Sequence, residues 1–244
     1  NSCKSDADCS AGNVCDCNNT CVPLAGQTNG KCCTRAAQCQ SGFCANGVCC
    51  DSACNTACAA CNLMGKVGTC SVQPKGQPGA PPCAPYLCNG ASASCPQVCA
   101  ADGDCTNGNI CNCNNTCVPP QQNGACCTRG GQCSSGFCVG GICCNAACGG
   151  ACQACNQQGS IGSCTVVGKG AVGAPACAPY LCDGSGAACP GACQSDADCA
   201  QGNICDCNNK CVPPQAIGLC CTRNGQCASG VCANGVCCQT ACGR

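Results

Sequence analysis

The sequence contains no histidine, tryptophan or glutamate, and its 244 residues include only two tyrosines, two phenylalanines and one methionine. Without histidine or glutamate, a nucleophile would lack its usual general base, and the aspartates lie in repeated motifs rather than in one unique constellation. We therefore expect no enzymatic activity, no catalytic residue and no cofactor. With so few large apolar side chains, the chain also cannot build the hydrophobic core usual for its length.

Charge is scarce as well. Ten basic residues balance ten acidic ones, every one of which is aspartate, so the formal net charge is zero. A balanced charge predicts neither a nucleic-acid partner nor attraction to an anionic membrane surface. No apolar run has the length of a membrane span, so we expect no membrane insertion. The composition does not indicate a small-molecule ligand.

Cysteine is the abundant residue: the chain has 48 cysteines, with 34 glycines and 14 prolines. This cysteine content is typical of a scaffold in which disulfides replace the core. Disulfides persist in oxidising compartments, so we expect the protein to be secreted or on the cell surface. The chain starts at Asn1 rather than at methionine, and we expect either a removed export signal or a piece of a longer chain.

Three kinds of cysteine-rich segment recur in the sequence. The five-cysteine segment has cysteines at 3, 9, 15, 17 and 21, and returns over 99–117 and 193–211. The seven-cysteine segment covers 32–54, 126–148 and 220–242. The six-cysteine segment covers 58–95 and 152–189 and occurs only twice. We number the copies of each segment in chain order.

The parity of these counts predicts the module boundaries. Five and seven cysteines are odd sets that become even only together, so each pair of segments is expected to close its disulfides internally. We therefore predict alternating modules, at 1–56, 98–150 and 192–244 with twelve cysteines each, and at 57–97 and 151–191 with six cysteines each.

Turn residues predict the local structure. Asn46-Gly47, Gly140-Gly141 and Asn234-Gly235 separate short cysteine-bearing runs, as in tight β-hairpins. A second hairpin is expected around the Asn-Asn pairs at 18–19, 114–115 and 208–209, because asparagine tolerates positive φ. The predicted fold is small and disulfide-rich: a tandem array of short β-hairpin modules with almost no helix, stacked into an elongated rod.

Adjacent cysteines cannot readily bond to each other, because neighbouring side chains in an extended chain point apart. Each member of such a pair is expected to reach a different partner and to act as a structural disulfide cysteine. These positions are Cys32, Cys33, Cys49, Cys50, Cys126, Cys127, Cys143, Cys144, Cys220, Cys221, Cys237 and Cys238. The connectivity itself is not readable from the sequence.

Two kinds of metal site are alternatives to structural roles. Pairs of aspartates flank one residue in each five-cysteine segment and are weak candidates for calcium ligands, although aspartate capping a turn is favoured. These residues are Asp6, Asp8, Asp102, Asp104, Asp196 and Asp198. Cysteine pairs spaced as in zinc sites, such as Cys58 and Cys61, are better explained by disulfides.

Several other residues have structural explanations. The arginine that follows each Cys-Cys-Thr motif, at 35, 129 and 223, is expected to satisfy turn carbonyls or to pair with an aspartate of its module. The two tyrosines and two phenylalanines are expected to be small apolar plugs of their modules. Asn18 and Asn114 begin sequons at hairpin tips and are possible glycosylation sites.

The runs GQCSSGFCVGGICCNAAC (131–148) and ACQACNQQGSIGSC (151–164) carry a resemblance. They are similar to the cysteine-rich tandem-repeat regions of secreted and surface proteins of myxobacteria and related bacteria. Other portions share the disulfide pattern of Dickkopf-type and knottin-like modules, without implying kinship. The resemblance implies an extracellular stalk or surface element and supplies no catalytic residue.

Taken together, these features favour a non-enzymatic extracellular structural protein, a disulfide-locked rod that associates head to tail into a fibre or forms a surface stalk. One alternative is a secreted binding module such as an adhesin, a ligand trap or an inhibitor. The hairpin tips argue against it, because they are small and nearly uniform. A second alternative is a metal-thiolate protein.

Overall fold

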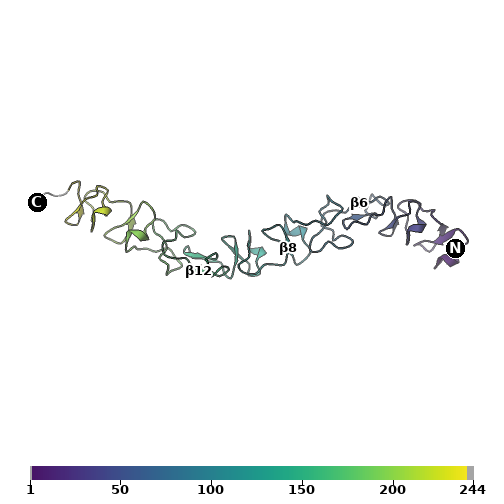
Figure 1. Ribbon diagram of the computed structural model, residues 1–244, viewed down its shortest axis with the longest axis horizontal. Helices are drawn as coiled ribbons and strands as arrows, with labels where there is room; N and C mark the ends of the chain where they lie inside the picture. Colours follow the sequence, from purple (N-terminus) through teal and green to yellow (C-terminus); the bar gives the residue numbers. More distant parts are fainter. Residues whose placement is uncertain (1, 241–244) are drawn as a thin grey trace. The chain divides into compact units, whose positions relative to one another are not determined.

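A computed structural model describes residues 2–240. The chain divides into two compact units, Asn1–Pro120 and Gln121–Arg244. Within the described residues every sheet is a two-stranded antiparallel hairpin, and the only helices are single 3₁₀ turns (Figure 1). The prediction of a small disulfide-rich fold made of short hairpins is confirmed.

The first unit contains four hairpins and three 3₁₀ turns. The hairpins are β1 (Asn13–Cys15) with β2 (Cys21–Pro23), β3 (Cys44–Ala45) with β4 (Val48–Cys49), β5 (Ala59–Ala60) with β6 (Ser71–Val72), and β7 (Ile110–Cys111) with β8 (Cys117–Val118). The 3₁₀ turns are η1 (Asp6–Asp8), η2 (Ala36–Gln38) and η3 (Asp102–Asp104).

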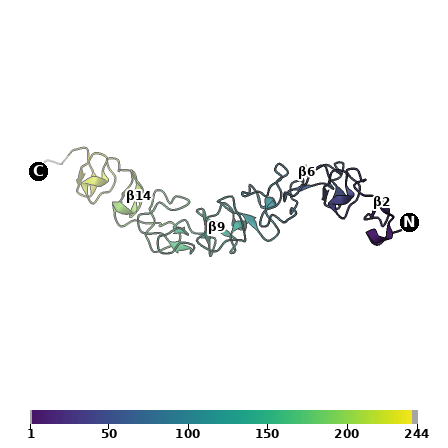
Figure 2. The ribbon, with the colours of Figure 1, turned by 45° about the vertical axis from the view of Figure 1, so that its right-hand side comes forward.

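The second unit is built in the same way, with the hairpins visible from a second direction in Figure 2. They are β9 (Phe137–Val139) with β10 (Ile142–Cys144), β11 (Gln153–Ala154) with β12 (Thr165–Val166), β13 (Ile204–Cys205) with β14 (Cys211–Val212), and β15 (Cys232–Ala233) with β16 (Val236–Cys237). The 3₁₀ turns are η4 (Gly130–Gln132), η5 (Asp196–Asp198) and η6 (Asn224–Gln226).

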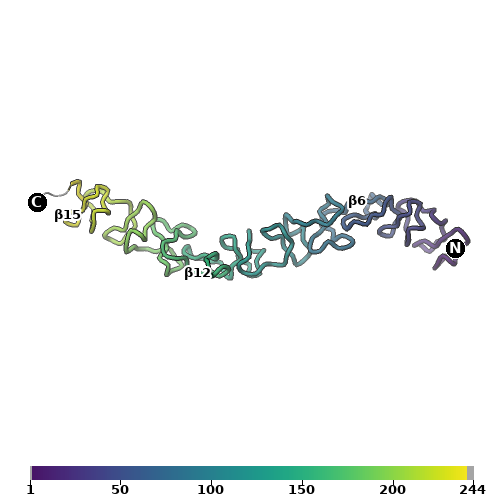
Figure 3. Tube along the Cα trace, in the orientation of Figure 1, coloured from purple at the N-terminus to yellow at the C-terminus, as the bar shows by residue number. Residues whose placement is uncertain are grey.

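The tight turns occur at the residues that the sequence indicates. Figure 3 follows the Cα trace through the hairpins. Between β3 and β4, Asn46 and Gly47 have φ values of 52° and 78°. Asn19, at the tip of the β1–β2 hairpin, has a φ of 58°. Two successive residues with positive φ match the right-handed twist of short hairpins, so these turns fix the register of the flanking cysteines. In the Pro/Gly-rich loop of each six-cysteine segment, two Ala–Pro peptide bonds are cis.

Cystine forms most of the buried core. In the first seven-cysteine segment, Cys33, Cys39 and Cys49 form a cluster in which each residue is at most 3% exposed. Cys33 pairs with Cys44, and Cys39 pairs with Cys49. Similar small clusters recur in the other segments. The expectation that covalent cross-links replace a large apolar core is confirmed.

The disulfides do not close within the expected twelve-cysteine modules. Cys17–Cys32 joins the five- and seven-cysteine segments, as the sequence predicts. However, Cys50–Cys61 and Cys54–Cys70 cross the expected boundary between residues 56 and 57. Cys144–Cys155 and Cys148–Cys164 cross the corresponding boundary in the second copy. The prediction that each twelve-cysteine set is covalently self-contained is therefore wrong.

The alternation of side chains along a strand explains why disulfides cross the expected module boundary. Cys49 is the last residue of β4 and bonds to Cys39 inside its own segment. The side chain of Cys50, the next residue, points away from that core and reaches Cys61 of the six-cysteine segment. An even count is therefore compatible with pairing across the boundary. The adjacent cysteines at 32/33, 49/50, 143/144 and 220/221 do bond to different partners, as predicted.

Candidate functional site: contacts between the cysteine segments

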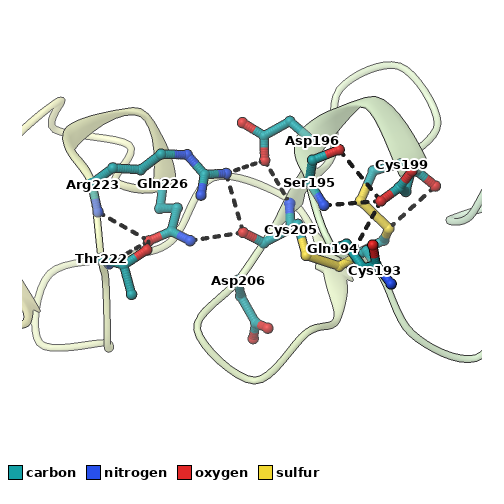
Figure 4. A network of polar contacts seen from close by, with 12 residues as sticks. Cys193, Gln194, Ser195, Asp196, Cys199, Cys205, Asp206, Thr222, Arg223 and Gln226 are labelled. Atoms are coloured by element: carbon teal, nitrogen blue, oxygen red, sulfur yellow. Dashed lines mark hydrogen bonds and ion pairs between the residues drawn. A yellow bond between two sulfur atoms is a disulfide. The ribbon is translucent and has the colours of Figure 1, made fainter.

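In the first and third copies, a buried glutamine that the sequence did not predict joins the five-cysteine segment to the seven-cysteine segment that follows it. In the third copy, Gln226 is 1% exposed (Figure 4). Its Oε1 accepts hydrogen bonds from the amide and the hydroxyl of Thr222, at 2.5 and 3.2 Å. Its Nε2 donates to the carbonyl of Cys205 at 2.8 Å. The only signal in the sequence was a glutamine recurring before the third cysteine of the segment.

An arginine and an aspartate complete this contact. Arg223 pairs with Asp196 and donates to the carbonyl of Cys205 at 3.3 Å (Figure 4). In the first copy, Arg35 pairs with Asp6 in the same way. The predicted pairing of arginine with an aspartate of its own module is therefore confirmed for Arg35 and Arg223. For Arg129 that pairing stays a prediction.

The aspartates proposed as weak calcium candidates act as backbone caps. Asp6 Oδ1 accepts from the amide of Cys15 at 2.9 Å, and Asp8 Oδ2 accepts from the amides of Lys4 and Ser5. The hydrogen bond from Arg35 is the largest influence that lowers the pKa of Asp6, and the amide of Lys4 does the same for Asp8.

The other copies repeat these hydrogen bonds. Asp102 and Asp196 accept from the amides of Cys111 and Cys205, both at 2.8 Å. Asp104 and Asp198 cap the residues that precede η3 and η5. The favoured capping role is confirmed, and a calcium role for these six residues stays a prediction.

The contact between the seven- and six-cysteine segments combines two disulfides with hydrogen bonds. In the first copy, Asn46 Oδ1 accepts from the amide of Cys61 at 2.9 Å. Asp51 Oδ1 accepts from the amide of Cys70 at 2.8 Å, and the Asp51 amide donates to the carbonyl of Gly68 at 3.0 Å. The second copy keeps both bonds made by Asp51, with Asn145 in its place. Disulfides and hydrogen bonds thus both hold the seven-cysteine segment against the six-cysteine segment.

Backbone packing at this contact leaves no room for a side chain. A Cβ added to Gly68 would lie 2.4 Å from the nitrogen of Gly30, and one added to Gly162 would lie 2.5 Å from the nitrogen of Gly124. Both distances are far below a van der Waals contact. The glycines at 68 and 162 are therefore required by the close approach of two backbones, in addition to their positive φ.

The contact between a six-cysteine segment and the following five-cysteine segment is non-covalent in the described residues. Lys75 Nζ lies 2.7 Å from Asp104 Oδ1, and this hydrogen bond is the main cause that lowers the pKa of Asp104 to about 2. The amide of Leu87 donates to the Asp104 carbonyl at 2.8 Å, and the amide of Thr106 donates to the Pro85 carbonyl at 2.9 Å. Lys169 and Asp198 form the equivalent ion pair in the second unit, at 2.8 Å.

The aromatic residues only partly match their expected role. Tyr86 packs against the cysteine cluster of the five-cysteine segment that follows it, and Tyr180 does the same in the second unit. The tyrosines therefore plug the next segment rather than their own module. Phe43 and Phe137 are each 40% exposed, so the expectation that they are buried plugs is wrong. With cystine clusters filling the interior, no apolar cavity needs them.

The sequon asparagines Asn18 and Asn114 are both exposed at their hairpin tips. Glycosylation at these positions stays a prediction. Clusters of three sulfur atoms, such as those of Cys33, Cys39 and Cys49, lie within 4.8 Å of one another. These cysteines are bonded in disulfides, and a disulfide sulfur is not the thiolate that binds a metal.

Cys238 departs from the prediction that it is a disulfide cysteine. It is the one free cysteine among residues 2–240. The matching residues in the first two copies, Cys50 and Cys144, bond to the six-cysteine segment that follows them. The described part of the third copy has no such segment beside it. Within the described residues, Cys238 is unpaired for the same reason that disulfides cross the module boundaries: this position bonds to a six-cysteine segment and not to its own module.

Similar cavities lie beside the five-cysteine hairpin in the first and third copies. The cavity in the third copy has a volume of about 420 Å³ and is lined by Asp206, Pro213 and Gln215, among others. Its counterpart in the first copy, about 340 Å³, is lined by Asp16, Pro23 and Gln27 among others. The side-chain amide nitrogens of both glutamines are buried without a hydrogen-bond partner.

Comparisons with known proteins give no match. No protein-family model matches the chain, and neither a curated protein nor a solved structure matches it. The resemblance to myxobacterial repeat regions therefore stays a prediction. Extensive disulfide bonding indicates an oxidising compartment. No helix within residues 2–240 has the length and apolar character needed to cross a membrane.

Proposed function

We propose that the chain is a non-enzymatic extracellular structural protein, a disulfide-locked rod that forms a fibre or a surface stalk. The observation that carries the proposal is the short range of the cross-links. The disulfides described here join cysteines between 10 and 30 residues apart, as in Cys39–Cys49 and Cys58–Cys88. Cross-links between neighbouring segments favour linear stacking, in which each segment contacts only the one before and the one after it.

Small-angle X-ray scattering of the intact chain tests the proposed rod. A globular protein of this length has a radius of gyration of about 18 Å. A rod requires a value well above this, with a scattering profile typical of an elongated particle. A compact value in the folded, fully oxidised chain would contradict the proposal. Full reduction is the control, because it should convert the profile into that of a flexible chain.

Head-to-tail association into filaments belongs to the same proposal. The near-zero net charge supports it, because it gives no long-range repulsion between copies. Electron microscopy of native material at high concentration should show filaments or end-joined particles. Only short monodisperse particles at every concentration would contradict the assembly while leaving the rod itself to the scattering test.

A secreted binding module is the second candidate, because the cavities beside Gln27 and Gln215 recur and each contains an unpartnered amide nitrogen. Such a donor suits a ligand with a carbonyl or hydroxyl oxygen. A screen of small polar ligands by NMR would show shifts of the Gln27 and Gln215 side-chain amides together. Shifts at neither glutamine would remove this candidate.

A further inference from the structure

Among residues 2–240, no six-cysteine segment lies against one face of the third seven-cysteine segment, whereas the same face is covered in the first two copies. The uncovered face comprises Ile217, Gly218, Asn234, Val236 and Cys238. In the first two copies, the matching face carries a six-cysteine segment through disulfides, hydrogen bonds and glycine packing. We call the surface in the third copy the open face.

The backbone of the open face has the conformation that binds a six-cysteine segment in the other copies. Gly218 has a φ of 92°, close to the 87° of Gly30 and the 93° of Gly124. The amide of each of these glycines donates to a strand carbonyl at 2.8 Å. A Cβ added to Gly218, however, would meet nothing within 4 Å. The site for the second glycine backbone is formed and empty.

The side chain of Asn234 on the open face is also unpartnered in the described residues, and the Cys238 thiol donates only to the carbonyl of Val236, at 3.5 Å. Asn234 matches Asn46, whose side-chain oxygen accepts from Cys61, but Asn234 has no side-chain hydrogen bond within residues 2–240. It has a φ of 53°, against 52° for Asn46. The Asn234 side-chain oxygen and the Cys238 thiol therefore lie at the positions of Asn46 and Cys50, which bind the six-cysteine segment in the first copy.

Exposed apolar residues surround these groups. Ile217 is 61% exposed and Val236 is 39% exposed. The first two copies have asparagine at the position of Ile217, at 29 and 123, and their residues matching Val236 are half-buried. A six-cysteine segment bound to the open face would reduce the exposure of these two residues.

We propose that the open face binds a further polypeptide segment with the six-cysteine pattern of residues 57–97, and that Cys238 forms a disulfide with its second cysteine. A second copy of this chain is not the occupant, because Cys61 and Cys155, the second cysteines of its two six-cysteine segments, are already bonded. End-to-end assembly of copies through this face would then need a six-cysteine segment between them.

Disulfide formation here needs an oxidant of the small-molecule disulfide class. The Cys238 thiolate attacks that disulfide, forms a mixed disulfide and releases one thiolate. The thiolate of the incoming cysteine then attacks the Cys238 sulfur and releases the second thiolate. The protein disulfide forms while the small disulfide is reduced, by two electrons, to two thiols.

An extended chain tests the inference, with a copy of residues 145–191 placed directly after Cys238. The chain is folded in a thiol–disulfide redox buffer, and mass spectrometry of unreduced peptides identifies the partner of Cys238. We expect a disulfide to the copied Cys155. A free Cys238 or a Cys238–Cys238 dimer would overturn the inference if the copied Cys152–Cys182 disulfide has formed. Scattering from the unextended chain tests the proposed rod separately.

Two glycine variants within the copied segment show whether the face itself directs the pairing. Gly162→Ala in the copy should lower the fraction of correctly bonded Cys238 by about tenfold, equivalent to about 1.4 kcal/mol, because the added methyl group overpacks the contact between the two backbones. Gly159→Ala in the copy is the matched control: Gly159 also has positive φ, but an added Cβ meets nothing within 4 Å. Equal effects of the two variants would contradict binding through the open face.

The intact chain provides a further readout. Native alkylation should label Cys238 in the intact chain and should not label it in the extended chain. Cys50 and Cys144 should remain unlabelled in both. A Cys238–Cys242 disulfide in the intact chain would overturn the inference, because it removes the thiol on which the open face depends.

Discussion

The two ends of a six-cysteine segment contact their neighbours through different kinds of bond. At the preceding segment, Cys50–Cys61 and Cys54–Cys70 are covalent, and the backbone of Gly68 fits closely against Gly30. At the following segment the contact consists of backbone hydrogen bonds, the packing of Tyr86 and one ion pair. The difference shows that the covalent unit ends after the six-cysteine segment rather than before it.

This comparison places the less stable junction at residues 96–98 in the first unit and at 190–192 in the second. No disulfide described here crosses either stretch, whereas two cross each preceding boundary. Local opening under stress is expected first where only weak contacts join two segments. Four predictions test the comparison, from the largest expected effect to the smallest.

Removing one covalent link should have the largest effect. Replacing Cys50 and Cys61 together by serine should lower the free energy of unfolding by about 3 kcal/mol, because the disulfide restricts the unfolded chain. Guanidinium unfolding of the oxidised protein measures this change. Cys238→Ser is the matched control and should leave the stability unchanged, because Cys238 forms no disulfide within residues 2–240. Equal losses in both variants would contradict the assignment.

A methyl group in the glycine contact should have the second largest effect. Gly68→Ala places a Cβ against the Gly30 backbone, whereas Gly65→Ala meets nothing within 4 Å. Both positions have positive φ, so both variants share the backbone cost. We expect Gly68→Ala to destabilise the protein by about 2 kcal/mol more than Gly65→Ala. Thermal unfolding of the pair measures the difference, and equal midpoints would refute close packing.

Removing the ion pair at the non-covalent contact should have a smaller effect. Lys75 is 63% exposed, so Lys75→Met should cost about 0.5 kcal/mol. The change should be local, with faster hydrogen exchange at the amides of Leu87 and Thr106. Lys66→Met is the control, because Lys66 has no ion pair in the described residues. Unchanged exchange at both amides would show that the ion pair does not stabilise this contact.

Acidification should act on the same contact, and at neutral pH it has no effect because Asp104 is then ionised. The pKa of Asp104 is about 2 in the folded protein, below its ordinary value of 3.8. The carboxylate therefore contributes stability that is fully present above about pH 4 and is lost as the pH falls through about 2. Exchange at Leu87 should accelerate over this range, after correction for intrinsic pH dependence. Exchange at Cys61, which bonds to the neutral Asn46, is the reference.

The sequence by itself determined the local structure. Asn46-Gly47 and the Asn-Asn pairs specify tight turns because few other residues adopt positive φ without strain. The spacing of the cysteines then sets which residues lie opposite each other in each hairpin. The scarcity of large apolar residues likewise determined that cystine fills the interior, and these predictions needed no knowledge of long-range contacts.

Only the tertiary structure decided which segments are joined. An even cysteine count allows closure inside a module or across its boundary, and the direction of the Cys50 side chain resolves that choice. Gln226 could not be recognised as a buried link from its sequence position, because its role depends on the Cys205 carbonyl 21 residues away. The free thiol of Cys238 follows from the same cause: pairing depends on which segment lies beside a cysteine, and a count of cysteines contains no information about neighbours.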